Sequence, residues 1–199
     1  MGRLWDEIEG GRPKMVILKQ FRTPADFWTG MVEPDYRDAR SNPADLRAAF
    51  RAAISLFHMH DWVWCTHEAA VRATFTFKDG AGRTFAVHDA GTFANSLEQQ
   101  NDDFGRIRSI ANAAKHLELK DIRPVPNAAS HAANTAVHVP GAGQGGYGVG
   151  AGYGTPGLSY AGPPRVMLKG PPGKEMEFYD IAKTVCDMWT TLRVKYGWW

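Results

Sequence analysis

The stretch SNPADLRAAFRAAISLFHMHDWVWCTH, residues 41–67, carries the clearest helical pattern in this chain of 199 residues. Its apolar side chains recur at steps of three and four, a spacing that places them on one side of an α-helix. Asn42 is a capping residue type and Pro43 suits the first helical turn, so we expect the helix to begin there. Such a stripe must be covered by other elements, which favours a bundle of helices. Its members are Leu46, Phe50, Ala53, Phe57 and Trp64.

The segment before this helix predicts a shorter one. In the sequence TPADFW, Thr23 can cap a helix and Pro24 fits its first position. We expect this helix to end early, because Gly30 and Pro34 follow closely. Further upstream, the branched apolar run over residues 13–21 predicts a strand or an extended entry segment.

After the long helix, the spacing of the apolar residues changes from a helical to an alternating pattern. Residues 72–91 alternate, pass through the turn sequence KDGAG and alternate again, which is typical of a small hairpin. A coil connection between two helices is the alternative. Residues 92–119 predict a short helix, a break near 101–103 and then a longer helix. The apolar side of that longer helix consists of Ile107, Ile110, Ala111, Ala114 and Leu117.

The remainder of the chain predicts an irregular segment followed by a closing helix. Residues 120–174 contain many prolines, which exclude a long helix, and their strand-like flanks NTAVHV and PRVMLKG enclose a glycine-rich loop. Residues 174–199 return to helical spacing. We therefore expect one mainly α domain over 1–199, a helical bundle with 120–174 inserted as a small β-hairpin-like, Gly/Pro-rich excursion.

The composition narrows the classes of function. The formal net charge is +2, so a long basic groove for nucleic acid is not indicated. Two distant cysteines, Cys65 and Cys186, form no zinc or redox motif and no disulfide framework, and we expect Cys65 to pack within its helix. No apolar run reaches the roughly 20 residues of a membrane helix. The N-terminus has no secretory stretch, and we expect a cytoplasmic protein without a membrane partner.

The glycine-rich loop contains a misleading match to a dinucleotide-binding pattern. Gly141, Gly143 and Gly146 satisfy G-x-G-x-x-G, but no helix can follow to hold a pyrophosphate, so we expect no such cofactor. A metal site is not expected either. In HMHDW, His58 and His60 are two residues apart and point to different sides of a helix.

Three polar residues, Arg108, Asn112 and His116, advance by four along the longer helix and therefore share one of its sides. An arginine can hold a phosphate, an asparagine can orient a ribose, and a histidine can move a proton near neutral pH. Lys115 borders this polar row. The combination indicates a small RNA-cutting site. The simpler alternative is the solvated side of a helix with a cation near its C-terminus.

His58 and Asp61 are candidate supporting residues for the polar row. They are three residues apart and can hydrogen-bond to each other on one helix. If their helix packs beside the row, both can face it, and Asp61 can fix the ring of a histidine or pair with Lys115. Otherwise His58 is a histidine at the edge of the core, bonded to Asp61.

The alanine-rich helix that ends in HMHDW, together with the later helix that carries RSIANAAKH, resembles a set of uncharacterised bacterial and phage proteins. These are distantly similar to the HEPN superfamily, helical-bundle proteins of toxin–antitoxin, abortive-infection and CRISPR-associated systems. The resemblance covers residues 43–67, 103–117 and 175–196. It implies a helical bundle whose RNA-cutting members need no metal and are often dimeric.

The resemblance also implies roles for particular residues. The motif of the RNA-cutting members is an arginine, a polar residue after it, and a histidine four to six residues beyond. Arg108, Ser109 and His116 take these positions, but seven residues separate Arg108 from His116, one more than the motif allows. Many members of the superfamily are binding modules without activity, and this departure favours that outcome here.

Two functions are therefore expected from the sequence. The first is a HEPN-like endoribonuclease or RNA-binding protein of a defence or toxin-type system. His116 would act as general acid or base, Arg108 would stabilise charge on the phosphate, and Asn112 would orient the substrate. The second is a non-enzymatic accessory protein that binds a protein partner or a second copy. Its contact surface would be the Tyr/Gly-rich loop 141–157 or the aromatic C-terminus YGWW. A purely structural helical protein is the third interpretation.

Overall fold

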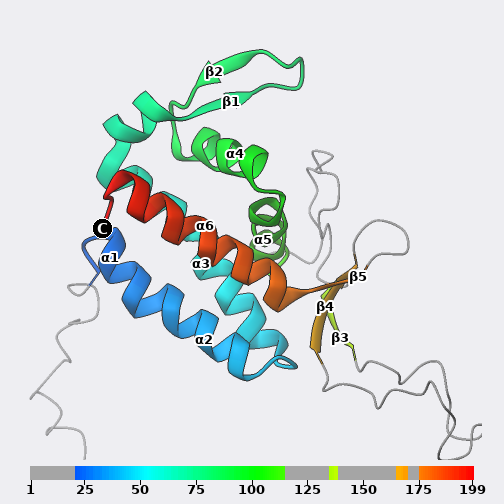
Figure 1. Ribbon diagram of the computed structural model, residues 1–199. Helices are drawn as coiled ribbons and strands as arrows, with labels where there is room; N and C mark the ends of the chain where they lie inside the picture. The colour runs from blue at the N-terminus through cyan, green and yellow to red at the C-terminus, as the bar shows by residue number, and fades with distance from the viewer. Residues whose placement is uncertain (1–20, 115–134, 139–164, 170–174) are drawn as a thin grey trace, which may run out of the picture.

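The computed structural model describes residues 21–114, 135–138, 165–169 and 175–199, and within them helices predominate (Figure 1). The predicted mainly α bundle with a small β elaboration is confirmed. The helical elements are α1 (Pro24–Phe27), η2 (Trp28–Val32), α2 (Glu33–Ser41), α3 (Leu46–Thr74), α4 (Ala90–Gln100), α5 (Asp102–Ala113) and α6 (Phe178–Tyr196). The strands are β1 (Thr76–Lys78), β2 (Thr84–Ala86), β3 (Thr135–His138), β4 (Arg165–Lys169) and β5 (Glu175–Glu177).

The long helix α3 is the centre of the fold and contacts α1, η2, α2, α4, α5 and α6. Its predicted start was wrong. The helix begins at Leu46, because the Asp45 carboxylate accepts hydrogen bonds from the backbone of Arg47 and Ala48. Asn42 instead closes the end of α2, where its side chain binds Asp38. The helix also continues past the predicted end to Thr74, through a local kink at His67.

The N-terminal helix is longer than predicted. Thr23 caps it as expected, in a reciprocal hydrogen-bond pair with Asp26. It does not end near Gly30, however, because α1, η2 and α2 form one continuous helical run. Gly30 lies within the π-helical turn η2, at a position where a side chain would collide with the Phe21 ring. Pro34 lies in the first turn of α2, where its missing N–H is tolerated.

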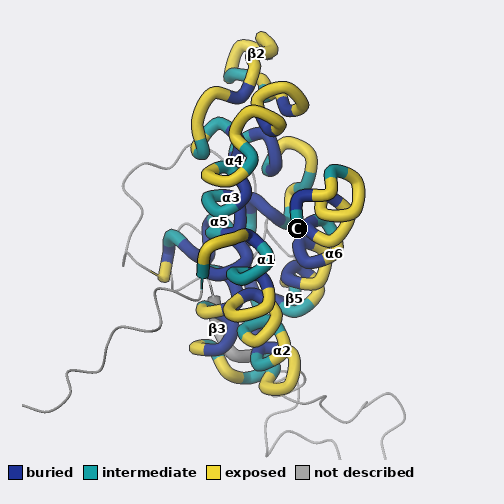
Figure 2. Tube along the Cα trace, turned by 90° about the vertical axis from the view of Figure 1, so that its left-hand side faces the viewer, coloured by how far each residue is buried: buried dark blue, intermediate teal, exposed yellow. Residues whose placement is uncertain are grey.

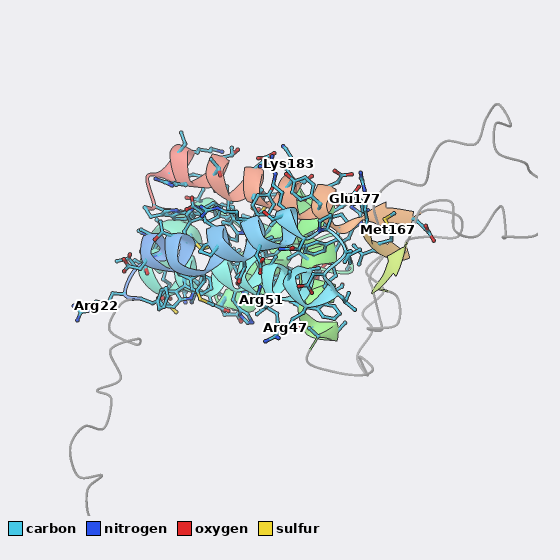
Figure 3. The ribbon with its side chains drawn as sticks, turned by 90° about the horizontal axis from the view of Figure 1, so that it is seen from below. Arg22, Arg47, Arg51, Met167, Glu177 and Lys183 are labelled. Atoms are coloured by element: carbon cyan, nitrogen blue, oxygen red, sulfur yellow. The ribbon has the colours of Figure 1, made fainter. Side chains whose placement is uncertain are left out.

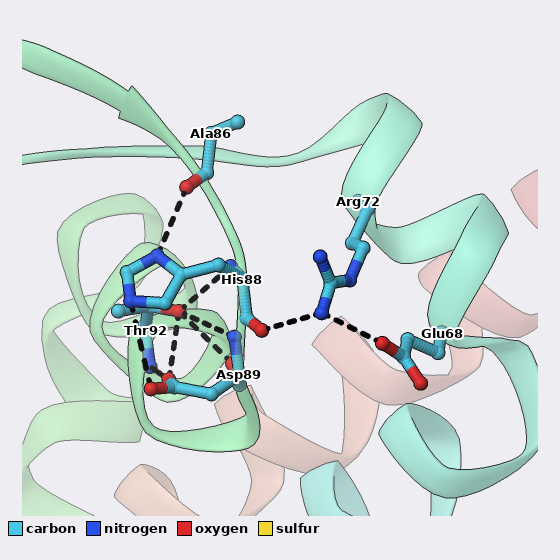
Figure 4. A network of polar contacts seen from close by, with 6 residues as sticks. All are labelled: Glu68, Arg72, Ala86, His88, Asp89 and Thr92. Atoms are coloured by element: carbon cyan, nitrogen blue, oxygen red, sulfur yellow. Dashed lines mark hydrogen bonds and ion pairs between the residues drawn. The ribbon is translucent and has the colours of Figure 1, made fainter.

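The predicted hairpin and the break between two helices are confirmed. Strands β1 and β2 pair antiparallel around a turn with Gly82 in the left-handed region (φ 78°). Asn101 ends α4 and begins α5, where its side-chain oxygen accepts from two backbone N–H groups. Figure 4 shows how the hairpin is joined to the bundle: Arg72 of α3 donates to the His88 carbonyl and pairs with Glu68.

The second sheet joins residues that are distant in sequence. The predicted strand flanks pair antiparallel as β3 and β4, and β5 adds a third strand that the sequence had placed in the closing helix. Helix α6 consequently begins at Phe178 rather than at residue 174. The Val166 amide donates to the Pro43 carbonyl (2.7 Å), which fastens the sheet to the bundle. Of the strand or extended segment predicted over 13–21, residues 13–20 lie outside the described residues.

The core forms where α3, α4, α5 and α6 meet (Figure 2). Trp189 of α6 is fully buried, and its indole N–H donates to the Leu56 carbonyl of α3 (3.1 Å). Cys65 is exposed, so its predicted packing was wrong, because position 65 turns to the solvent side of α3. Among the described residues, no helix is long and apolar enough to cross a membrane.

Candidate functional site

Arg108, the first residue of the predicted polar row, is held by α4. Its guanidinium donates to the side-chain oxygen of Asn95 (2.7 Å) and to the Glu98 carboxylate (3.0 Å). The arginine and this glutamate are both largely shielded from solvent, with 29% and 18% of their side chains exposed. Arg108 therefore joins two helices, and a phosphate that binds there must share the guanidinium with Glu98.

The rest of the polar row is only partly visible. Asn112 lies one turn beyond Arg108 on α5 and is half-buried. Lys115 and His116 lie outside the described residues, as does the glycine-rich loop over 141–157. The predicted geometry of the whole row, from the arginine to the histidine, therefore stays a prediction.

The supporting residues His58 and Asp61 do form a pair on α3. The Nδ1 of His58 lies 2.7 Å from Oδ2 of Asp61. A carboxylate accepts, so it holds the proton on Nδ1 and makes Nε2 the basic nitrogen of the neutral ring. The contact thus assigns the tautomer of His58: the carboxylate orients the ring, as the sequence had suggested for this aspartate.

The same carboxylate also contacts a second histidine that the sequence analysis had set aside. Oδ1 of Asp61 lies 3.2 Å from Nε2 of His60. His60 is buried, and its Nδ1–H donates to the Phe57 carbonyl (2.6 Å). Burial lowers the pKa of His60 below its ordinary value of 6.5, against the opposing effect of Asp61. His60 is therefore neutral at pH 7 and belongs to the core, whereas His58 is partly exposed.

Helix packing brings Arg108 towards these histidines. The Phe104 ring of α5 lies against Phe57 and His60 of α3, with ring centroids 5.9 Å and 6.3 Å away. Arg108 follows one turn after Phe104, and its positive charge contributes to the lowered pKa of His60. This packing places Arg108 near His60, whereas the predicted approach of His58 and Asp61 to the polar row stays a prediction.

A cavity of about 380 Å³ opens beside His58, between α3 and the helical run α1–η2–α2. Its walls are largely apolar, and two of their rings, Phe27 and Trp62, stack with centroids 5.0 Å apart. Its polar lining consists of the His58–Asp61 pair together with Asp35, Arg51 and Ser55. The lining residues are Phe27, Met31, Asp35, Arg51, Ile54, Ser55, His58, Asp61 and Trp62.

Sequence reasoning missed Asp35 and Arg51. Arg51 of α3 is labelled in Figure 3. It contacts Asp38, and its Nε lies 4.0 Å from Oδ1 of Asp35. Partial burial raises the pKa of Asp35, outweighing the opposing effects of the nearby Ser55 hydroxyl and of the Arg51 charge. The available signal was spacing: residues 51, 55 and 58 share one side of α3 with the apolar positions that line the cavity.

Within the aromatic C-terminus, Trp198 is packed in the core, while Tyr196 and Trp199 are partly exposed. Trp198 is buried, stacks with Tyr196 (centroids 4.8 Å apart) and packs on Phe75 and Phe93. Its carbonyl also lies 2.7 Å from Nε2 of His67. Trp198 thus helps to fill the junction of α3, α4 and α6, and the predicted partner surface at the C-terminus stays a prediction.

Among the described residues, no group of three or more His, Cys, Asp or Glu side chains is arranged to hold a metal ion. Comparisons of the chain with protein-family models, with curated proteins and with solved structures gave no match. The cavity and the His58–Asp61 pair are therefore interpreted from their own chemistry.

Proposed function

We propose that this chain is a cytoplasmic, HEPN-like helical-bundle protein that binds RNA and cleaves it without a metal ion, at the cavity beside His58. The observation that carries the proposal is the His58–Asp61 pair at the edge of that cavity. A carboxylate-oriented histidine is a proton carrier suited to neutral pH. A concave, mainly apolar site with a few convergent polar groups is the usual form of a ligand site.

In the proposed reaction, Nε2 of His58 takes the proton of a ribose 2′-hydroxyl. The 2′-oxygen attacks the adjacent phosphorus, a new O2′–P bond forms, and the P–O5′ bond breaks. The leaving 5′-oxygen takes a proton from a general acid, for which His116 is the candidate that the sequence provides. The products are a 2′,3′-cyclic phosphate and a 5′-hydroxyl end, and the reaction as written consumes no metal ion or cofactor.

Each other residue has a supporting role in this proposal. Asp61 positions His58 and stabilises the imidazolium that forms when the ring takes a proton. Arg108 and Asn112 lie on α5, outside the lining of the cavity, and we assign them contacts with the flanking part of the RNA. Because Glu98 already shares the Arg108 guanidinium, we assign Arg108 a smaller contribution than His58.

The test is cleavage of a fluorescent single-stranded RNA by the purified full chain. Replacing His58 with Ala should lower the rate by about 100-fold or more, the usual contribution of general acid–base catalysis. The control is His88→Ala, prepared in parallel, since His88 is exposed and does not line the cavity. A substrate with a 2′-deoxyribose at the cleaved position should stay intact.

Two outcomes would contradict the proposal. If His58→Ala and His88→Ala cleave at the same rate, a contaminating ribonuclease explains the activity. If the wild-type chain neither cleaves nor binds RNA, the non-enzymatic accessory role becomes the better explanation.

A further inference from the structure

The cavity also carries polar groups that proton transfer at His58 does not use. Asp35, Ser55 and Arg51 line it, and Nε of Arg51 lies 4.0 Å from Oδ1 of Asp35. The Asp35 side chain is only 16% exposed, whereas Arg51 is 46% exposed. A shielded carboxylate offers two acceptor oxygens, and the guanidinium beside it offers donors. This part of the cavity therefore presents two hydrogen-bond acceptors, the carboxylate oxygens of Asp35, beside a donor, the guanidinium of Arg51.

The geometry points to a subsite for one unpaired guanine base, which deepens and rests on the proposed action on RNA. Guanine is the RNA base whose pairing edge carries two adjacent donors, N1–H and the N2 amino group, next to the acceptor O6. The two donors match the carboxylate of Asp35, and O6 matches the guanidinium of Arg51. Adenine, cytosine and uracil each place an acceptor opposite one of the carboxylate oxygens.

The shape of the cavity also suits a single base. Its volume of about 380 Å³ lies near the lower end of the range of roughly 300–1,000 Å³ that small-molecule sites occupy. Its walls include Phe27, Trp62 and Ile54, and apolar or aromatic walls are what splayed-out bases of single-stranded RNA contact. A duplex could not enter, so the substrate would be single-stranded at this nucleotide.

The subsite and the His58–Asp61 pair lie at a spacing that fits one nucleotide. Ser55 and His58 are three residues apart on α3, which is a rise of about 4.5 Å along the helix. A base held at Asp35 and Ser55 thus brings its own ribose to the turn that carries His58. Cleavage is expected on the 3′ side of guanosine.

The first experiment measures binding of nucleoside 3′-monophosphates to the full chain by titration calorimetry. The guanosine nucleotide should bind roughly tenfold or more tightly than those of adenosine, cytidine and uridine, as polar sites reject ligands that leave their groups unpaired. Inosine lacks the N2 amino group, so its 3′-monophosphate should bind with an intermediate affinity. This comparison needs no variant and therefore does not depend on a substitution that folds.

The matched variants are Asp35→Asn and Asp38→Asn. Both carboxylates contact Arg51, but only Asp35 lines the cavity. Asp35→Asn should remove the preference for guanosine, because an amide replaces one acceptor with a donor. Asp38→Asn should keep it. Equal binding of all four nucleotides, or an unchanged preference in Asp35→Asn, overturns the subsite.

The two proposals fail separately. If the guanosine nucleotide binds selectively and depends on Asp35, yet RNA stays intact, the subsite stands and the cleavage reaction falls. If His58-dependent cleavage occurs equally after every base, the cleavage reaction stands and the guanine subsite falls.

Discussion

At the scale of single residues, burial distinguishes two histidines that contact the same carboxylate. Asp61 contacts His58 and His60, but only His60 is buried. The sequence predicts the His58–Asp61 bond, because a separation of three residues suffices on any helix. It does not predict that Asp35 and Arg51 lie close together, because these side chains meet only when α2 packs beside α3.

Burial of His60 predicts a stability that falls on mild acidification. The folded chain keeps the pKa of this histidine below 6.5, so the unfolded chain binds the proton more readily. As pH falls through about 6.5, His60 lowers the free energy of unfolding by up to about 1.4 kcal/mol per pH unit. This loss stops once pH drops below the pKa of the folded state.

Urea denaturation at pH 7 and pH 5 measures this effect. In His60→Gln the loss between the two pH values should be smaller than in the wild type, whereas His88→Gln should match the wild type because His88 is exposed. Hydrogen bonds hold the pKa values of Asp26, Asp79 and Asp89 below 3.8, so these carboxyl groups do not titrate in this window. An identical pH dependence in His60→Gln would rule out His60 as the source.

At the scale of elements, the sequence predicts boundaries well where a side chain acts locally. Asn101 separates α4 from α5 through hydrogen bonds to its near neighbours, and the hairpin turn is fixed by its own residues. The prediction fails at Gly30 and Pro34, where contacts from other elements determine whether the helix ends. There the buried Trp28 and Val32 hold a π-helical turn against the core, and the helix continues.

The contact between α4 and α5 depends on Gly105. A Cβ atom at this position would lie 2.9 Å from Cγ of Glu98, whose carboxylate is tied to Arg108. Gly105→Ala should therefore lower the free energy of unfolding by about 1–3 kcal/mol, the usual cost of overpacking. Gly91→Ala is the matched control in α4, since its nearest atom would lie at an ordinary 3.5 Å.

Thermal and urea unfolding of the two alanine variants would measure the difference. Gly91→Ala should be neutral or stabilising by up to about 1 kcal/mol, because alanine favours the helix. Equal stability of both variants would mean that Glu98 moves away without cost, and that its bond to Arg108 does not fix the two helices.

At the scale of the whole molecule, the chain closes on itself through residues that are far apart in sequence. The β3–β4–β5 sheet meets the loop before α3 at Pro43, and Trp198 fills the junction of α3, α4 and α6. Neither contact could be predicted from periodicity. The YGWW segment suggested an interface because aromatic residues favour both interfaces and cores, and only the packing of the chain distinguishes the two.

The role of Trp198 can be decided by stability. If the ring closes the core, Trp198→Ala should lower the free energy of unfolding by about 3–5 kcal/mol, the usual cost of truncating a buried large aromatic residue. Val194 lies one turn earlier on α6 and is 78% exposed. Val194→Ala should therefore stay within about 0.5 kcal/mol of the wild type. A loss below about 1 kcal/mol for Trp198→Ala would instead return this ring to the candidate partner surface, because a side chain that serves an interface contributes little to the stability of the free chain.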